Sequence, residues 1–574
     1  MILQALKEYY DRKTRDGGTE LAPSGFEPKE IPFVVVLGQS GNFIDLEDTR
    51  DGDGKKKTGQ IRFVPQGIKR SGKNSWQTAY LLWDHIGYVF GYAEDDPERA
   101  RKQHESFLGR IRQAFPEPDA DEGVSAVLAF LERADFQPVY QHPYWEELQK
   151  SKGNISFRLL NDIDLVCQRP AVRAAVEHIE TTDAVQQRCL ISGENEIIER
   201  LHPSIKGVWG AQTSGANIVS FNLDAFNSYG KTQGFNAPIG QKAAFAYTSA
   251  LNHLLRKGSR QRLQVGDAST VFWAEKEHPL EDDFLALFEA DRDDPDRNIN
   301  AVRALYRAPE TGTGHISDDD TRFYLLGLAP NAARIAVRFW HHSTVGELAG
   351  NIRQHFDDLR IVHGPRDPEF LSLSRLLEST ALQAKRDNVT PNLAGDFIRA
   401  ILSGAPYPWT LLTAAIRRIR AEHRLTYPRA ALIKAVLVRN HRQNLQEVDV
   451  SLDLANTNIG YRLGRLFAVL ERAQEAANPG INATIRERYY GAASATPVTA
   501  FPQLLKLKNH HIAKLENRGQ AVNLEKLLGE IMDGIDDFPP HLAMENQGRF
   551  AIGYYHQRQE FFKPSEHSQE DQHE

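Results

Sequence analysis

Cysteine is almost absent from this chain of 574 residues, which contains only Cys167 and Cys189. Two cysteines cannot build the disulfide framework of a secreted protein, and a reducing cytoplasm permits them. His178 and His202 add two more residues of zinc-binding type, but no CxxC pair occurs and the spacing is irregular. Because structural zinc sites use closely spaced pairs of ligands, we predict no metal site, and nothing in the sequence indicates a cofactor.

Long apolar runs are absent as well. No stretch reaches the roughly 18 apolar residues that a membrane-spanning helix needs. The first residues, MILQALKEYYDRK, mix acidic and basic side chains and contain no long apolar core, so we do not expect a secretory signal peptide. The sequence therefore predicts a cytoplasmic protein with no membrane partner.

Catalytic signatures are also missing. The chain contains no GxSxG nucleophile elbow, no HExxH pair and no zinc-deaminase signature, each of which places a nucleophile or metal ligands at fixed spacing. The neighbouring His510 and His511 have no companion cluster of carboxylates in the sequence. We therefore predict that the protein is not an enzyme. The alternatives are a stand-alone metal- or nucleotide-dependent nuclease and a plain structural scaffold.

The segment GIKRSGKN, residues 67–74 and termed here the basic loop, is one residue away from a Walker A phosphate-binding loop. A strand over 61–64 and a helix from Ser75 are predicted around it. Asn74 stands where a Ser or Thr hydroxyl would hold magnesium, which argues against ATP hydrolysis. The loop remains cationic, and we predict that it contacts nucleic acid. Its candidate residues are Lys69, Arg70 and Lys73 for the phosphate backbone and Asn74 for a base edge.

The remaining composition is that of an ordinary globular protein, with 41% hydrophobic and 25% charged residues, which excludes a mainly disordered chain. Strands are predicted at 31–37 and 43–46, and later at 321–328 and 333–340 with a helix capped at Ser343 or Thr344. Amphipathic helices are predicted at 97–115 and 122–134. From about Asp367 to Phe562 the pattern is helix after helix. We predict an α+β N-terminal domain over 1–150, a central α+β region with mixed or antiparallel sheets over 151–365, and an all-α bundle over 366–574.

Glycine is concentrated between Ser204 and Gln241, where six of the 38 residues are glycine. This density lets the backbone turn and lets another molecule approach closely. The amide, hydroxyl and lysine side chains between the glycines suit a polyanion with readable edges. We expect two loops on either side of a strand over 217–222; ordinary hairpin turns are the alternative. The candidates for base-edge or wedge contacts are Gln212, Thr213, Ser214, Asn217, Lys231, Gln233 and Asn236, and Lys206 is a candidate for the phosphate backbone.

Basic residues also gather in the C-terminal half. The whole chain has a net charge of −7, yet residues 411–520 hold 17 Lys or Arg against 8 Asp or Glu. Local fields, more than the total charge, determine how a protein meets a polyanion. Arginines at helical spacing can track a single-stranded backbone along one face, and a solvated charged face is the alternative. The candidates are Arg417, Arg420, Arg424, Arg462 and Arg465.

Three stretches within residues 1–275 are more specific than any single motif. They are IPFVVVLGQSGNFIDLEDTRDGDGKKK, VPQGIKRSGKNSWQTAYLLWDHIGYVFGY, and RLHPSIKGVWGAQTSGANIVSFN followed by AFNSYGKTQGFNAPIG. They resemble the large subunit of the type I-C CRISPR surveillance complex, Cascade. The remainder of the chain is similar in a more diffuse way.

This resemblance implies a role in antiviral defence. A protein of this family binds the 5′ handle of the CRISPR RNA, recognises a protospacer-adjacent motif (PAM) in double-stranded DNA and helps to form the R-loop. It then guides the displaced single strand and helps to recruit a nuclease-helicase. The implied protein partners are the backbone, handle-binding and small subunits of Cascade.

The resemblance also implies a second product, because relatives make their small subunit from an internal start within the same gene. The only methionines here are Met1, Met532 and Met544. A small-subunit-like product beginning at about residue 448 would therefore use a non-AUG codon, for example at Val448 or Val450.

Overall fold

The computed structural model describes residues 1–15, 21–52, 57–67, 70, 72–177, 186–288, 296–311, 319–441 and 448–563. Within these ranges the chain forms two compact units. Unit 1 comprises Met1–Ser204 and Val219–His253, and unit 2 comprises Ile205–Ile218 and Leu254–Glu574. The glycine-rich stretch is therefore divided between the two units. The boundaries predicted near residues 150 and 365 stay predictions.

Unit 1 is organised around a mixed four-stranded sheet with the order β3-β2-β6-β5. Strand β2 pairs antiparallel with β3 and parallel with β6, and β5 pairs antiparallel with β6. All five residues of β2, FVVVL, are buried, as expected for an apolar, β-branched central strand. The strands are β2 (Phe33–Leu37), β3 (Phe43–Asp48), β5 (Trp83–Asp84) and β6 (Ile155–Leu159).

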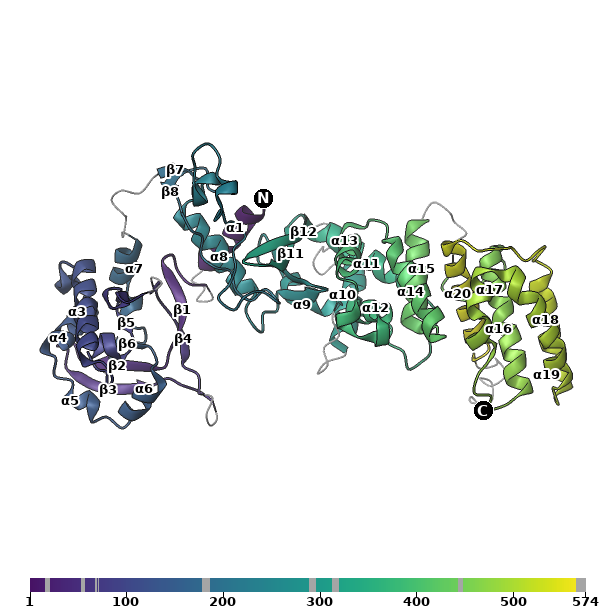
Figure 1. Ribbon diagram of the computed structural model, residues 1–574, viewed down its shortest axis with the longest axis horizontal. Helices are drawn as coiled ribbons and strands as arrows, with labels where there is room; N and C mark the ends of the chain where they lie inside the picture. Colours follow the sequence, from purple (N-terminus) through teal and green to yellow (C-terminus); the bar gives the residue numbers. More distant parts are fainter. Residues whose placement is uncertain are drawn as a thin grey trace. The chain divides into compact units, whose positions relative to one another are not determined.

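Helices cover this sheet and complete unit 1. Helix α4 packs on β2 and β6 and also contacts α3, and Figure 1 shows these elements together. Asp121 caps α4 by accepting hydrogen bonds from the Gly123 and Val124 amides. The two helices predicted at 97–115 and 122–134 are confirmed as α3 and α4. The helices are α1 (Ile2–Arg15), α2 (Ile86–Val89), α3 (Pro97–Ala114), α4 (Glu122–Arg133), α5 (Gln137–Tyr140), α6 (Trp145–Ser151), α7 (Pro170–Glu177) and α8 (Gln241–Leu254).

Two small antiparallel ribbons also belong to unit 1. One pairs β1 (Phe26–Ile31) with β4 (Gln60–Pro65), and the strand predicted before the basic loop is β4. The other pairs β7 (Gln186–Arg188) with β8 (Asn195–Ile197). This second ribbon lies at the start of the segment that leads into the glycine-rich stretch.

Unit 2 begins with an antiparallel sheet in the order β12-β11-β10-β9. The predicted hairpin is confirmed as β11 and β12, which turn at Asn331–Arg334. Thr344 caps the helix that follows, because its hydroxyl accepts from the Glu347 amide and the Glu347 carboxylate accepts from the Thr344 amide. The strands are β9 (Arg262–Val265), β10 (Ala268–Ala274), β11 (Arg322–Asn331) and β12 (Arg334–Thr344).

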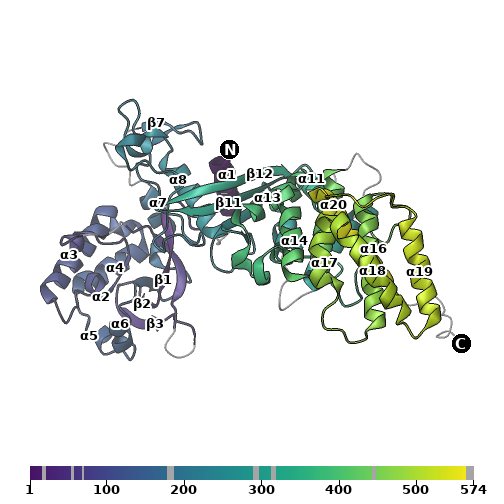
Figure 2. The same cartoon turned by 45° about the vertical axis from the view of Figure 1, so that its right-hand side comes forward.

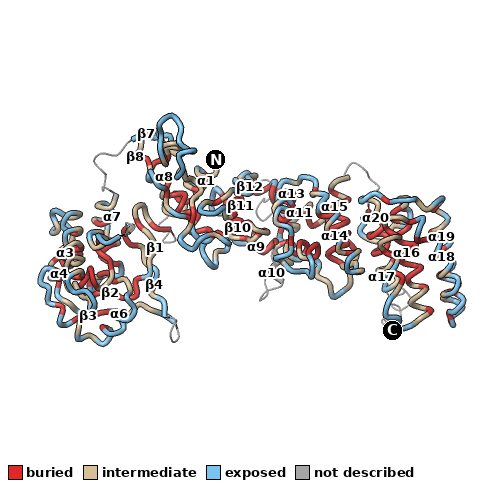
Figure 3. Tube along the Cα trace, in the orientation of Figure 1, coloured by how far each residue is buried: buried red, intermediate tan, exposed pale blue. Residues whose placement is uncertain are grey.

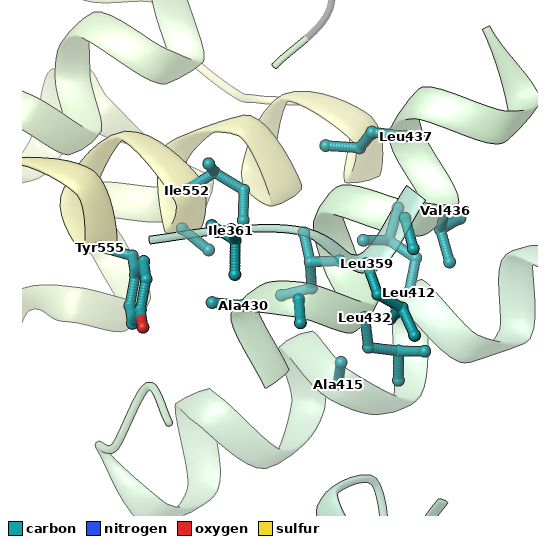
Figure 4. Packing of buried hydrophobic residues seen from close by; sticks show 14 of the residues in the cluster. Leu359, Ile361, Leu412, Ala415, Ala430, Leu432, Val436, Leu437, Ile552 and Tyr555 are labelled. Atoms are coloured by element: carbon teal, nitrogen blue, oxygen red, sulfur yellow. The ribbon is translucent and has the colours of Figure 1, made fainter. Parts of the chain in front are cut away.

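Beyond β12 the described residues form helices without a further strand, so the predicted fold class is confirmed: α+β followed by an all-α C-terminal region. One continuous apolar core runs from the sheet into the last helices, and Figure 4 shows the part of it where α11, α14, α15 and α20 meet. The helices of unit 2 are α9 (Leu280–Phe288), α10 (Asp296–Thr311), α11 (Val345–Leu359), α12 (Leu373–Ser379), α13 (Pro391–Ser403), α14 (Trp409–Glu422), α15 (Tyr427–Asn440), α16 (Ile459–Ala477), α17 (Ile485–Ala495), α18 (Pro497–Ala513), α19 (Arg518–Met532) and α20 (Met544–Glu560).

Helix α16 is the centre of the C-terminal bundle, where it packs against α17, α18, α19 and α20 (Figure 2). It runs parallel to α20, since Gly464 contacts Phe550 and, further along both helices, Glu475 pairs with Arg558. The backbones approach so closely that a Cβ at Gly464 would collide with the Phe550 carbonyl oxygen. Glycine is therefore required where these helices cross.

Two local predictions are wrong. The predicted strand over 217–222 is absent: Asn217 makes only an isolated bridge to Arg334, and the following residues are irregular. The helix predicted from Ser75 is a single 3₁₀ turn, Ser75–Gln77. In the structure the Asn217 carbonyl accepts from the Ile335 amide, and the Ser75 carbonyl accepts from the Tyr88 hydroxyl. Among the helices of the described ranges, none combines the length and the apolar character that crossing a bilayer requires.

Replacing Gly464 with alanine tests the close packing of α16 and α20. We expect Gly464→Ala to lower the free energy of unfolding by about 1–3 kcal/mol, because the new methyl group forces the two backbones apart. The matched control is Gly491→Ala in α17, where a Cβ meets no atom within 4 Å; it should stabilise by about 0.5–1 kcal/mol through helix propensity. Urea midpoints of the full chain measure both effects, and equal shifts of one sign would contradict the packing.

Candidate nucleic-acid interface

Arg70 anchors the basic loop to the rest of unit 1. Its guanidinium carbon lies 3.7 Å from the ring centroid of Tyr80 and 4.0 Å from that of Tyr88. Nη1 donates to Oδ1 of Asp84 at 2.9 Å, and Nη2 donates to Oδ2 of the same carboxylate. The Asp84 side chain is buried, whereas Arg70 is partly exposed. The cation predicted to hold phosphate is thus paired with a buried carboxylate within the unit, and its proposed contact with nucleic acid stays a prediction.

The other residues of the basic loop have different environments. Lys73 and Asn74 are exposed. Gly72 beside them has a φ of +73° and no atom within 4 Å of the position of a Cβ. Lys69 lies outside the described residues. A rigid arginine therefore supports a tip from which one lysine and one amide project into solvent.

The part of the glycine-rich stretch in unit 2, residues 205–218, is termed the first glycine loop. It is closed by reciprocal backbone hydrogen bonds of 2.9 Å between Ile205 and Ala216. The Asn217 carbonyl accepts from the Ile335 amide at 3.0 Å, which attaches the loop to β12. A Cβ at Gly207 would lie only 2.6 Å from the Leu255 carbonyl oxygen. The loop is therefore fixed at its base from two sides.

The tip of this loop carries most of the predicted base readers. Gln212, Thr213 and Ser214 are adjacent and exposed, and the Gly215 amide donates to the Gln212 carbonyl at 2.9 Å to close the turn. Asn217 lies at the base and is partly buried, while Lys206 is exposed. Three polar side chains are thus presented together by a braced turn.

Trp209 in the same loop is not among the residues that the sequence pattern predicts. Its side chain is 59% exposed, and its backbone amide donates to Ser269 Oγ at 3.0 Å. Val208 beside it is buried. An aromatic flanked by two glycines, in the segment KGVWG, is the signal that could have indicated it.

The second glycine loop, residues 223–237 of unit 1, uses one predicted base reader for its own structure. Asn236 Oδ1 accepts from the Ser228 amide at 3.0 Å, and its Nδ2 donates to the Gln233 carbonyl at 3.0 Å. Gln233 is partly buried with a φ of +49°, whereas Lys231 is exposed. Asn236 therefore braces the loop from inside, and Lys231 remains at its surface.

Cys189 ties the end of this segment to the β7–β8 ribbon. Its Sγ accepts hydrogen bonds from the Gly240, Ile191 and Ser192 amides at 3.2, 3.4 and 3.5 Å. Burial raises the pKa of the Cys189 thiol, but these amide donors outweigh it and the pKa is lowered overall. In Cys167, by contrast, burial raises the pKa to about 12. Figure 3 marks exposed chain beside β7 and β8 in pale blue.

The five predicted arginines do not share one kind of environment. Arg417 and Arg424 are exposed on and just after α14. Arg420 donates to Gln547 Oε1 at 2.7 Å, and Arg462 donates to the Asn456 carbonyl at 3.0 Å. Arg465 is buried and donates to Gln557 Oε1 at 3.2 Å, and burial lowers its pKa. The last three hold the bundle together; contact with a strand stays a prediction for all five.

Helix α18 and its C-cap residue expose basic side chains that are not among the predicted candidates. Lys506, His510 and Lys514 are exposed and follow one another at intervals of four residues, so they share one face. Lys514 Nζ donates to Asn478 Oδ1 at 2.6 Å. The repeat of four in KLKNHHIAK is the sequence signal that identifies this face.

Comparison with known families adds to this geometry. A family model described as CRISPR-associated protein (Cas_Csd1) matches residues 6–562. The chain belongs to this family. The match spans the basic loop, both glycine loops and the C-terminal bundle, so a role in a CRISPR system is shown for the chain as a whole. No curated protein sequence matches it.

In this Cas_Csd1 chain, polar and basic side chains are exposed at the tips of loops whose bases are fixed by hydrogen bonds. Across the ranges that the structure describes, no three His, Cys, Asp or Glu side chains gather in a way that could hold a metal ion. His178, one of the four residues weighed for zinc, lies outside those ranges. The chemistry that the described tips can perform is hydrogen bonding to base edges and charge pairing with phosphate.

Substitution of Arg70 tests whether this residue stabilises unit 1 through its ion pair with Asp84. We expect Arg70→Ala to lower the free energy of unfolding of unit 1 by about 3–5 kcal/mol, because it leaves the buried Asp84 carboxylate unpaired. Arg70→Lys should restore little, since lysine cannot form the paired hydrogen bonds or stack between two rings. Lys73→Ala is the matched control and should stay within about 0.5 kcal/mol of wild type. Urea midpoints and amide exchange in β5 measure the effect; a wild-type midpoint for Arg70→Ala would contradict it.

Proposed function

We propose that this Cas_Csd1 protein is the large subunit of a type I-C CRISPR RNA-guided surveillance complex. It recognises the PAM in double-stranded DNA, aids duplex opening and R-loop formation, and guides the displaced strand. The observation that carries the proposal is the adjacent, exposed trio Gln212, Thr213 and Ser214 on a loop whose base is fixed to β12. Family membership supports the CRISPR context, and the sequence resemblance to type I-C large subunits supports the subtype.

The trio suits motif recognition for a physical reason. Amide and hydroxyl groups both donate and accept hydrogen bonds, so they can match the donor and acceptor pattern on a base edge. A braced loop loses little conformational freedom when it binds. Few such contacts suffice, since pairing with the guide RNA supplies most of the sequence recognition and the protein checks only a short motif.

Exposed basic residues outside the first glycine loop suit binding of the duplex backbone and guidance of the displaced strand. Lys73 on the basic loop and Lys231 on the second glycine loop are exposed, as phosphate contacts on duplex DNA require. Arg417, Arg424 and the exposed face of α18 would guide the displaced strand through its backbone. The proposed partners are the CRISPR RNA 5′ handle, the other Cascade subunits and a nuclease-helicase. Cleavage is assigned to that nuclease-helicase, and the protein itself acts without catalysis.

The motif preference of the assembled, guide-loaded complex tests this function. We expect wild type to bind a matched duplex with the correct adjacent motif more tightly than one without it. Gln212→Ala with Thr213→Ala should reduce that preference by about 5–150-fold, since one good base contact contributes about 1–3 kcal/mol of discrimination. Binding to a target that is already opened should be unchanged. Affinities are measured at one fixed salt concentration, because phosphate contacts alone shift them strongly.

Gln113→Ala, at an exposed glutamine on α3, is the matched control and should keep the full preference. If the double variant keeps it as well, the first glycine loop does not read the motif. Cleavage of DNA by the isolated chain with magnesium would favour the nuclease alternative. A complex without any motif preference would favour the scaffold.

The salt dependence of binding tests Lys73 separately. We expect Lys73→Ala to weaken duplex binding for every sequence alike and to reduce the slope of log K against log salt by about 0.9, the value for one phosphate contact on B-DNA. The matched control is Lys150→Ala, because Lys150 is exposed and pairs with Glu146 on its own helix. An unchanged slope for Lys73→Ala would show that the basic loop does not contact phosphate.

A further inference from the structure

A cavity of about 590 Å³ lies inside unit 2, and none of its lining residues belongs to the loops or basic faces described above. It is bounded by α10, by residues of the segment 360–370 that follows α11, by the start of α15 and by Val450. Sites for small molecules and cofactors have volumes of about 300–1,000 Å³. The cavity is therefore large enough for a small ligand, and its lining shows which kind.

Tyr427 supplies a buried hydrogen-bond donor on the wall of this cavity. The residue is only 7% exposed, and its hydroxyl makes no hydrogen bond to any residue that the structure describes. Buried hydroxyl groups normally have a hydrogen-bond partner. Burial raises the pKa of Tyr427 to about 12, so the hydroxyl keeps its proton at neutral pH. It can therefore donate a hydrogen bond to a group that enters the cavity.

Two arginines line the same cavity and suit an anionic group. Arg360 is exposed at the end of α11, and its guanidinium forms no ion pair within the described part of the chain. Arg303 on α10 pairs with Glu369 at 2.6 Å, and both side chains are about half exposed. Such an exposed pair is weak, whereas arginine forms strong, often bidentate hydrogen bonds with phosphate. A phosphate group would therefore find one unpaired guanidinium and a second one that is only weakly held.

Aromatic rings from three segments make up much of the remaining lining. The rings of Tyr306 and Phe370 are stacked, with centroids 6.3 Å apart and an angle of 21° between their planes. The rings of His363 and Tyr427 lie with centroids 4.9 Å apart. The Tyr306 hydroxyl donates to Asp357 Oδ1 at 2.8 Å, which fixes this ring in place. Flat aromatic surfaces of this kind bind planar rings by stacking.

A nucleotide combines the two chemical features that the lining matches. Its base is a planar ring that stacks on aromatic side chains without dependence on sequence, and its phosphate is an anion that arginine and a hydroxyl donor can bind. Inorganic phosphate alone would leave the aromatic part of the lining unused. A nucleoside alone would leave the arginines unused.

We propose that this cavity is a binding site for a free mononucleotide, with its base against the aromatic rings and its phosphate held by Arg360, Arg303 and the Tyr427 hydroxyl. The inference goes beyond the proposed function and does not rest on it, because it requires neither guide RNA nor target DNA. The Val362 amide donates to the Val450 carbonyl at 2.8 Å, so the wall joins the segment after α11 to the chain that enters the C-terminal bundle. A bound nucleotide contacts both parts and stabilises unit 2 by mass action.

Calorimetric titration of the full chain, without guide or DNA, tests the site with adenosine monophosphate (AMP) as the probe. We expect saturable binding of one AMP per chain at millimolar concentration or below, and an unfolding midpoint that rises with AMP concentration. Adenosine and inorganic phosphate should each bind at least about 10-fold more weakly, because each lacks half of the contacts.

Substitution of Arg360 separates the phosphate contact from the ring contact. Arg360→Gln should weaken AMP binding about 10–150-fold, the factor for one hydrogen bond to a charged group, and should leave adenosine binding within about twofold of wild type. Tyr427→Phe should also weaken AMP binding about 10-fold, with an unfolding midpoint that is unchanged or higher because an unpartnered hydroxyl is removed. Arg488→Gln, at an exposed arginine on α17 outside the cavity, is the matched control and should bind AMP as wild type does.

Each outcome supports or overturns the site. Absence of AMP binding by the wild-type chain overturns it, and so does an Arg360→Gln variant that binds AMP as tightly as wild type. Inorganic phosphate that binds as tightly as AMP reduces the cavity to an anion site and overturns the nucleotide assignment. These results are independent of motif preference in the assembled complex, so the proposed function and the nucleotide site fail or hold separately.

Discussion

Close approach of one backbone to another, at positions where only glycine fits, is the constraint on which the loops and the bundle both depend. Gly207 lies against the Leu255 carbonyl, Gly234 against the Glu199 carbonyl, and Gly464 against the Phe550 carbonyl. Each contact removes the space that a methyl group would occupy. In the bundle this lets two parallel helices share a core, and in the loops it fixes the base while the tip stays in solvent. The glycines of this stretch therefore allow many backbone conformations in principle, but in the folded protein they fix the base of each loop.

Several basic side chains form ion pairs within the protein and are therefore not exposed to a partner. Arg70 pairs with Asp84 in unit 1, and in unit 2 the buried Arg439 pairs with Asp358 at 2.6 Å. Such pairs are costly to break, because the remaining charge is left without a partner in an apolar interior. A count of basic residues along the C-terminal half thus overstates the surface that a nucleic acid can meet. The exposed cations are fewer, and they lie on loop tips and on the outer faces of helices.

The C-terminal helices are continuous with the rest of unit 2. Helix α20 packs against α14 and α15, and Gly548 faces Leu412, Ile433 and Leu437. A shorter product that begins near residue 448 would contain α20 without these covering helices. Its apolar side would then need another partner, since exposed apolar surface of this kind favours association. The internal start that the resemblance implies would therefore leave an apolar side of α20 uncovered.

The sequence by itself determined those features whose causes are local. The strands β2 and β3, the helices α3 and α4, the β11–β12 hairpin and the helical C-terminal region all follow from periodicity and capping within a few residues. The motifs that carry the family resemblance are also continuous in the chain. The exposed trio Gln212, Thr213 and Ser214 was predictable for the same reason, because glycine-rich turns favour the surface.

Only the tertiary structure decided which polar side chains are exposed to a binding partner and which hold the fold together. Asn236 and Lys231 belong to one chemical pattern in the sequence, yet one braces the loop and the other is exposed. Arg465 is buried and donates to Gln557, which is 92 residues away in the chain, and no local pattern carries that information. Periodicity and capping act over one or two turns of chain, whereas burial and pairing depend on segments that folding brings together from far apart.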